Sequence, residues 1–134
     1  VEINTLNALS VTSAIAYGTI AAGSDTGATN STTTATTTGN VAIDSNISGS
    51  DMTSGGNTLD VGQQCYLASS FTWASTCTGS VALTTSATRL ELSNAYPSNT
   101  TSPPSSSTSW GIGIPTGQTN GAYTGTNNVD AIAD

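Results

Sequence analysis

The carboxylates are the side chains of this sequence with the most evident capacity for chemistry. Eight acidic residues are spread singly along the chain: Glu2, Asp25, Asp44, Asp51, Asp60, Glu91, Asp130 and Asp134. Their spacing contains no D-x-D-x-D run of the kind that binds calcium. A glycosidase needs two carboxylates about 5–10 Å apart across a cleft. Nothing in the spacing of these residues indicates such a pair.

The residue types that are missing narrow the chemistry further. The chain has no histidine and no lysine, and its one cationic side chain is Arg89. Without histidine it has no Ser-His-Asp or Cys-His site and no imidazole metal ligand. Without lysine it has no Schiff base and no lysine to contact a phosphate in a P-loop. We therefore expect a protein that is not an enzyme and that binds no cofactor or metal.

The net charge of the chain indicates which classes of partner it does not suit. The formal net charge is −7, whereas nucleic-acid binding needs clustered lysine and arginine and anionic membranes attract basic surfaces. No apolar run approaches the roughly 18 residues of a membrane span. We expect no nucleic-acid partner and no membrane span. Arg89 is expected to pair with a neighbouring carboxylate or to cover a sheet edge.

Two cysteines, Cys65 and Cys77, flank the stretch YLASSFTWAST. A disulfide that closes a loop of this size stabilises a fold by about 3 kcal/mol in the chain-entropy treatment. The alternative is a redox or metal pair, but the C-x-x-C spacing is absent and no histidine assists. The sequence therefore predicts a disulfide between Cys65 and Cys77.

Several features favour an extracellular or cell-surface location. The chain begins at Val1 without an initiator methionine or a basic leader, which we interpret as a mature product whose signal peptide has been removed. A disulfide fits an oxidising compartment. Three sequons make Asn30, Asn46 and Asn99 candidate N-glycosylation sites. They either carry glycans as covalent partners or arise by chance in a chain rich in Asn, Ser and Thr.

Period-2 alternation between turn signals recurs along the chain, and no helix-length segment has a 3.6-residue apolar stripe. The alternation predicts strands over about 1–6 and 9–17, over the threonine run, within 40–52, around the two cysteines, within 80–96, over 110–114, and from Tyr123 onward. This pattern predicts an all-β fold, a single immunoglobulin-like or jelly-roll antiparallel β-sandwich with an extended N-terminal strand.

Two stretches carry a resemblance to known domains. The turn Tyr17-Gly18-Thr19-Ile20 with Gly23, followed later by Thr38-Gly39-Asn40-Val41, resembles the opening of immunoglobulin-like domains of the MSP/ASH type. The closing IPTGQTNGAYTGT resembles the last hairpin of many secreted immunoglobulin-like modules. The resemblance implies a fold and says nothing of an activity.

The run NSTTTATTTGN, residues 30–40, lies between the two matching motifs. The resemblance implies that this run is a strand, and threonine suits a pleated strand because it is β-branched. The alternative is a disordered, O-glycosylated tract. As a strand it would place Thr32, Thr34 and Thr36 on one face and Thr33, Ala35 and Thr37 on the other.

The N-terminal strip VEINTLNALSV is β-prone, alternating and almost uncharged. We divide the chain into an extended segment, residues 1–11, and a β-sandwich domain, residues 12–134. Such a segment can add as a strand to the sheet edge of a neighbouring subunit, as in donor-strand complementation. The candidate donor and interface residues are Val1, Ile3, Leu6, Leu9 and Val11.

These features favour a structural subunit of an extracellular filament, a homopolymer of the pilus-like or biofilm-matrix kind. In organisation it is similar to TasA/camelysin-type fibres and archaeal bundling pili, an analogy without a shared motif. One alternative is a secreted adhesin or carbohydrate-binding module, in which Trp73 and Trp110 would be sugar platforms and not core plugs. Another is a repeat module of a larger surface-layer protein.

Overall fold

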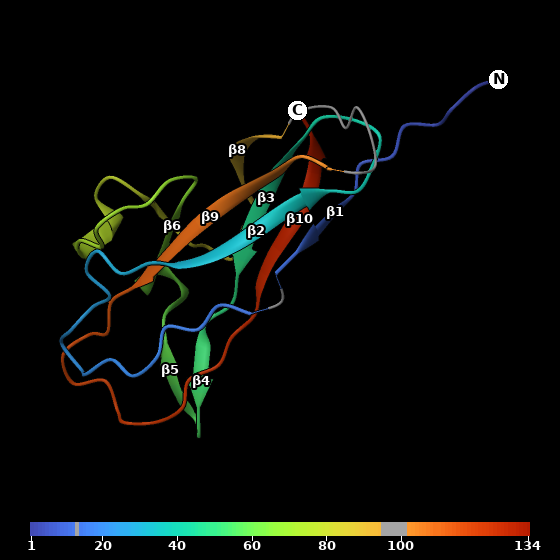
Figure 1. Cartoon of the computed structure of the whole chain (residues 1–134). Coiled ribbons are helices and arrows are strands. Elements are labelled where there is room, and N and C mark those ends of the chain that lie inside the picture. Colours follow the sequence, from blue (N-terminus) through green and yellow to red (C-terminus); the bar gives the residue numbers. More distant parts are fainter. Residues whose placement is uncertain (13, 95–101) are drawn as a thin grey trace.

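The computed structural model describes residues 1–12, 14–94 and 102–134, and it is all-β (Figure 1). A five-stranded antiparallel sheet has the order β1 (Leu9–Val11), β2 (Ser31–Thr37), β9 (Ser105–Ile112), β6 (Gln64–Leu67) and β7 (Val81–Ala82). A three-stranded sheet has the order β10 (Asn127–Ala133), β3 (Ile43–Gly49) and β8 (Thr88–Asn94). A small hairpin joins β4 (Met52–Ser54) to β5 (Asn57–Leu59), and two 3-10 turns follow, η1 (Val61–Gln63) and η2 (Ser75–Cys77). The predicted antiparallel β-sandwich is confirmed.

The core lies between the two larger sheets. It is built from side chains that alternate along strands of both: Ala35, Tyr66 and Trp110 from the five-stranded sheet, and Ile47, Leu90 and Leu92 from the three-stranded one. The rings of Tyr66 and Trp110 have centroids 5.5 Å apart at a tilt, a favourable arrangement for an aromatic pair. They are the two largest fully buried side chains of the described residues.

The threonine run forms β2, as predicted. Thr33, Ala35 and Thr37 are buried, while the residues that alternate with them lie on the outer face. The indole nitrogen of Trp110 donates a 2.8 Å hydrogen bond to the hydroxyl of Thr33. The inner threonine face therefore supplies the polar partner that a buried tryptophan needs.

The predicted strands over 1–6 and 9–17 are wrong in extent, because only Leu9–Val11 pairs with β2. Beyond β1, side-chain hydroxyls occupy the backbone groups that a longer ladder would use. Thr12 Oγ1 accepts from the amide of Thr34 at 3.0 Å, and Ser31 Oγ donates to the carbonyl of Ala16 at 2.5 Å. Such side-chain hydrogen bonds compete with sheet pairing. Residues 14–22 accordingly belong to no strand.

The predicted closing hairpin is also wrong. β9 lies inside the five-stranded sheet, whereas β10 lies at the edge of the three-stranded sheet, so the chain between them crosses from one layer to the other (Figure 1). Along this crossing Thr124 forms a bridge to Thr53 in β4, with backbone hydrogen bonds of 2.9 and 3.1 Å. The crossing closes the end of the sandwich beside the β4–β5 hairpin.

Candidate functional site

The N-terminal segment, residues 1–8, carries every large apolar side chain that is exposed in the described residues. These side chains are Val1, Ile3 and Leu6, and Ile3 is 79% exposed. Figure 1 shows the segment running away from the sandwich at the end where the C-terminus also lies. A cluster of exposed apolar side chains marks an interaction surface more often than a single exposed one.

Asn40 fixes the base of this segment. The side-chain oxygen of Asn40 accepts from the backbone amide of Leu6 at 2.7 Å, and the backbone amide of Asn40 donates to the carbonyl of Leu6 at 3.0 Å. Its Nδ2 donates to the carbonyl of Asn4 at 2.9 Å. Gly39 permits this approach, because a Cβ there would lie 2.0 Å from the Leu6 carbonyl oxygen. The Gly39-Asn40 pair of the resemblance thus has a physical role here.

Leu9 and Val11 have a different environment from the other predicted donor residues. Leu9 lies opposite Thr37 and Val11 opposite Ala35 in the β1–β2 pairing of the same chain. Both are half-buried, and Val11 packs against the core. In this structure the segment outside the sandwich therefore ends at Ala8, and of the five candidates Val1, Ile3 and Leu6 lie in it.

Cys65 and Cys77 form a disulfide, as predicted, with their Cα atoms 5.6 Å apart. The bond joins β6 to η2 and is buried. In the β6–β9 pairing Tyr66 lies opposite Trp110 in the core, so Cys65 and its partner Gly111 face outward. The disulfide therefore fastens the 68–80 loop onto the outer face of the five-stranded sheet.

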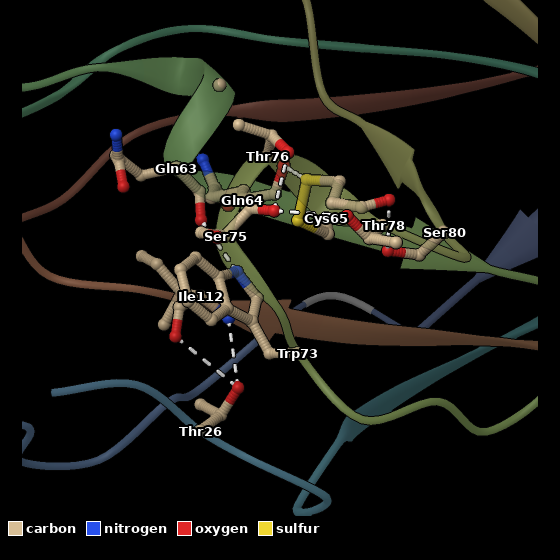
Figure 2. Close-up of a disulfide and its surroundings, with 12 residues drawn as sticks. Thr26, Gln63, Gln64, Cys65, Trp73, Ser75, Thr76, Thr78, Ser80 and Ile112 are labelled. Carbon is tan, nitrogen blue, oxygen red and sulfur yellow. Dashed lines mark hydrogen bonds between the residues drawn. A yellow bond between two sulfur atoms is a disulfide. The ribbon is translucent and has the colours of Figure 1, made fainter.

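The loop held by the disulfide covers this outer face with two aromatic rings. A Cβ on Gly113 would lie 2.2 Å from Trp73 Cζ2, and one on Gly111 would lie 3.1 Å from Phe71 Cζ. The Trp73 amide donates to the carbonyl of Gly27 at 2.7 Å, and its indole nitrogen points to the carbonyl of Gln63 at 3.3 Å (Figure 2). Gly111 in β9 and Gly113 just after it make the space in which these rings lie.

The two tryptophans therefore have structural roles. Trp110 is fully buried in the core, so it offers no ring face for sugar stacking. Trp73 lies with its ring against Gly113 and its indole nitrogen bonded to Gln63. The interpretation of Trp73 and Trp110 as plugs of the fold agrees with these contacts.

The three sequons differ in accessibility. Asn30 Oδ1 accepts from the amide of Phe71 at 2.9 Å, and its Nδ2, the atom that would carry a glycan, is buried without a partner in the described part of the chain. Asn46 lies in β3 between the buried Ser45 and Ile47, so it faces outward. Asn99 lies outside the described residues. A glycan on Asn30 is incompatible with this packing, whereas Asn46 is open to one.

Three carboxylates from three different strands or ends converge on Arg89. Its guanidinium contacts Asp44 Oδ2, Glu91 Oε1 at 2.6 Å and Asp134 Oδ1 at 3.4 Å. The hydrogen bond that Arg89 donates to Asp44 is the largest of the effects that raise the pKa of Arg89. In the described residues these carboxylates are the one group close enough to share a metal ion, but Arg89 already supplies the positive charge. We interpret the group as an ion-pair network that ties β10 to β3 and β8.

Two clefts flank residues 15–17. The smaller, about 370 Å³, lies between residues 11–17 and the start of β10. The larger, about 770 Å³, lies between residues 15–22 and residues 118–123. No charged side chain lines either cleft, so their chemistry is apolar contact and hydrogen bonding. Acid–base catalysis has no titrating carboxylate there to use.

Gln64 organises the polar part of the smaller cleft. Its Oε1 accepts from the hydroxyl of Tyr17 at 3.1 Å and from Nδ2 of Asn127 at 3.0 Å. Burial raises the pKa of Tyr17 well above its ordinary value. These bonds hold residues 15–17 against the open side of the sandwich.

Comparison with protein-family models, curated proteins and solved structures finds no match for this chain. The resemblance to MSP/ASH-type domains and to fibre subunits therefore stays a prediction. Within residues 1–12, 14–94 and 102–134, no helix is long and apolar enough to cross a membrane.

Sequence reasoning missed the outer aromatic cover and both clefts. A signal for the cover was present, because Phe71-x-Trp73 and Gly111-x-Gly113 share the i, i+2 spacing of one strand face. Glycine inside a strand often marks a close approach of another group. The clefts have no such signal, since segments far apart in the chain form their walls.

Proposed function

We propose that this protein is the structural subunit of an extracellular filament, pilus-like or of the matrix-fibre kind. In it, the N-terminal segment of one copy adds as a strand to the next copy. One observation carries the proposal: Val1, Ile3 and Leu6 are exposed, while the sandwich covers the other large apolar side chains of the described residues. Burial in a neighbour would give these side chains the cover that their own chain does not provide.

The surroundings of the segment support this role. Asn40 anchors residues 4–6 and leaves residues 1–3 free to reach outward. These three residues in extended form span about 10 Å, enough to reach into the surface of a neighbouring copy. The alternation of Val1 and Ile3 with Glu2 presents one apolar and one polar face. The disulfide supports a secreted protein, since such bonds persist in oxidising compartments.

Electron microscopy of the purified full chain tests the proposal. We expect filaments from the full chain and from Glu2→Gln, the matched control on the polar face. We expect no filaments from a variant that lacks residues 1–8, nor from Ile3→Asp. Unchanged filaments after the deletion would overturn the donor role of the segment. A full chain that stays monomeric and monodisperse at high concentration would overturn the filament as a whole.

A further inference from the structure

The larger cleft has the properties of a receptor for an apolar strand. Its floor includes the buried Leu59 and Ile112, and Met52, Ile114 and Tyr123 add to its lining. Its volume of about 770 Å³ lies within the usual range for binding pockets of roughly 300–1,000 Å³. No charged residue lies on its walls. A strand that turns a face of apolar side chains toward the cleft fits this lining.

One wall of the cleft also has free backbone groups. In the described part of the chain, the amides of residues 14–22 donate no hydrogen bond. Unpaired backbone beside an apolar cleft is the arrangement that strand addition uses, because pairing satisfies the amides while side chains fill the cleft.

The positions of the segment and the cleft determine what their contact would build. In Figure 1 the N-terminal segment leaves the sandwich at one end, and residues 15–22 and 115–123 lie at the opposite end. A contact between two different surfaces on opposite ends is head-to-tail. Such a contact does not close on itself in a dimer and adds copies in an open series.

We propose that the cleft between residues 15–22 and 118–123 receives residues 1–3 of a second copy of this chain. Val1 and Ile3 enter the cleft, and Glu2 on the other face of the strand points to solvent. The inference rests on the proposed filament function and identifies the acceptor surface in it. The smaller cleft is a less suitable acceptor because its volume is about half as large.

Cysteine trapping in the full chain tests the acceptor. Ile3→Cys is combined with Thr119→Cys at the exposed rim of the larger cleft, or with Thr126→Cys at the exposed rim of the smaller one as the matched control. Both native cysteines are buried in their disulfide. After mild oxidation we expect a ladder of linked copies from the 3/119 pair on a denaturing gel, and monomer from the 3/126 pair.

A second set of variants tests the same surface without new cysteines. Ala122→Trp adds bulk at the exposed lining of the larger cleft, and Ala68→Trp adds the same bulk at an exposed position outside both clefts. We expect Ala122→Trp to abolish filaments and Ala68→Trp to leave them. Circular dichroism shows whether each variant keeps the β fold.

The possible failures are distinguishable. Filaments that persist in Ala122→Trp, or a ladder from the 3/126 pair alone, would overturn the acceptor and leave the proposed function standing. Absence of both filaments and a 3/119 ladder from full chains would overturn the function and the acceptor together.

Discussion

Asn40 and Leu6 exchange two hydrogen bonds, one in each direction. The Leu6 amide donates to Asn40 Oδ1 at 2.7 Å, and the Asn40 amide donates to the Leu6 carbonyl at 3.0 Å. A single residue, through its backbone and its side chain, thus gives a fixed base to an otherwise exposed segment. The sandwich holds its N-terminal segment by hydrogen bonds at the turn after the threonine strand, residues 38–40.

Replacing Asn40 by alanine should loosen this base. Each lost hydrogen bond is worth about 1 kcal/mol, so we expect the Leu6 amide to exchange its hydrogen about five- to tenfold faster. Amide hydrogen exchange followed by NMR measures this directly. Asn128→Ala, on the exposed face of β10, is the control and should leave the exchange of Leu6 unchanged. Equal exchange of Leu6 in wild type and Asn40→Ala would show that Asn40 does not hold the segment.

Gly113→Ala should destabilise the protein by about 1–3 kcal/mol, as overpacking does, because its Cβ would overlap the ring of Trp73. Urea unfolding measures this. In a Trp73→Ala background the same substitution should cost about 0.5 kcal/mol or less, since the ring is gone. Such a double-mutant cycle isolates the pair. If the cost of Gly113→Ala is the same in both backgrounds, the ring is not what the glycine accommodates.

Asp44→Asn should be more damaging than Glu91→Gln, although both residues contact Arg89. The Asp44 side chain is 0% exposed and that of Glu91 is 67% exposed. Asp44 also accepts from the Leu92 amide at 2.8 Å. Weakening these buried charged bonds should lower the free energy of unfolding by about 1.5–3 kcal/mol. The exposed Glu91 pair should contribute about 1 kcal/mol at most. Denaturant titration compares the two, and a reversed order would refute the ranking.

Alkaline pH should destabilise the fold through its buried tyrosines. Burial raises the pKa of Tyr17 and of Tyr66 in the native state, while the unfolded pKa is about 10. Below pH about 10 both states keep the phenolic protons, and the stability does not change on their account. Above it the unfolded state loses them first, so the native state binds more protons and stability falls as pH rises.

Tyr17→Phe isolates one of these phenols. The variant also loses the hydrogen bond to Gln64, which changes the free energy of unfolding at every pH. The quantity to compare is therefore the slope of the free energy of unfolding against pH. Above pH about 10 we expect the slope to fall in magnitude by up to about 1.4 kcal/mol per pH unit, the value for one proton. Urea unfolding between about pH 8 and about pH 11 supplies the curve. An unchanged slope would mean that Tyr17 titrates alike in both states.

The parts of the fold that depend on local alternation were predictable. The faces of β2 follow from period-2 spacing, so Thr33, Ala35 and Thr37 lie inward as expected. The end of β1 was not predictable, because it depends on hydroxyls of Thr12 and Ser31 that reach backbone groups far along the chain. The closing hairpin failed for a similar reason, since adjacent strands in sequence join different sheets.

Some features of the candidate sites were likewise predictable from the sequence, and others were not. The disulfide followed from two cysteines and a suitable loop. Arg89 was expected to pair with a neighbouring carboxylate or to cover a sheet edge, and it pairs with Glu91. Asp44 and Asp134 each lie 45 residues away from Arg89, and no local pattern connects them. The larger cleft is likewise formed by segments distant in sequence. Long-range packing decides these features.

In the proposed filament, the ion pairs of Arg89 affect how two copies of this protein approach one another. Because three carboxylates hold the chain's one cationic side chain, the charged side chains outside this group are all acidic: Glu2, Asp25, Asp51, Asp60 and Asp130. Approaching copies repel one another, and at physiological ionic strength this repulsion fades beyond about 8 Å. Dissolved salt is therefore what lets them come within reach of short-range apolar contacts. Dilute buffer should keep copies apart, and added salt should speed their association.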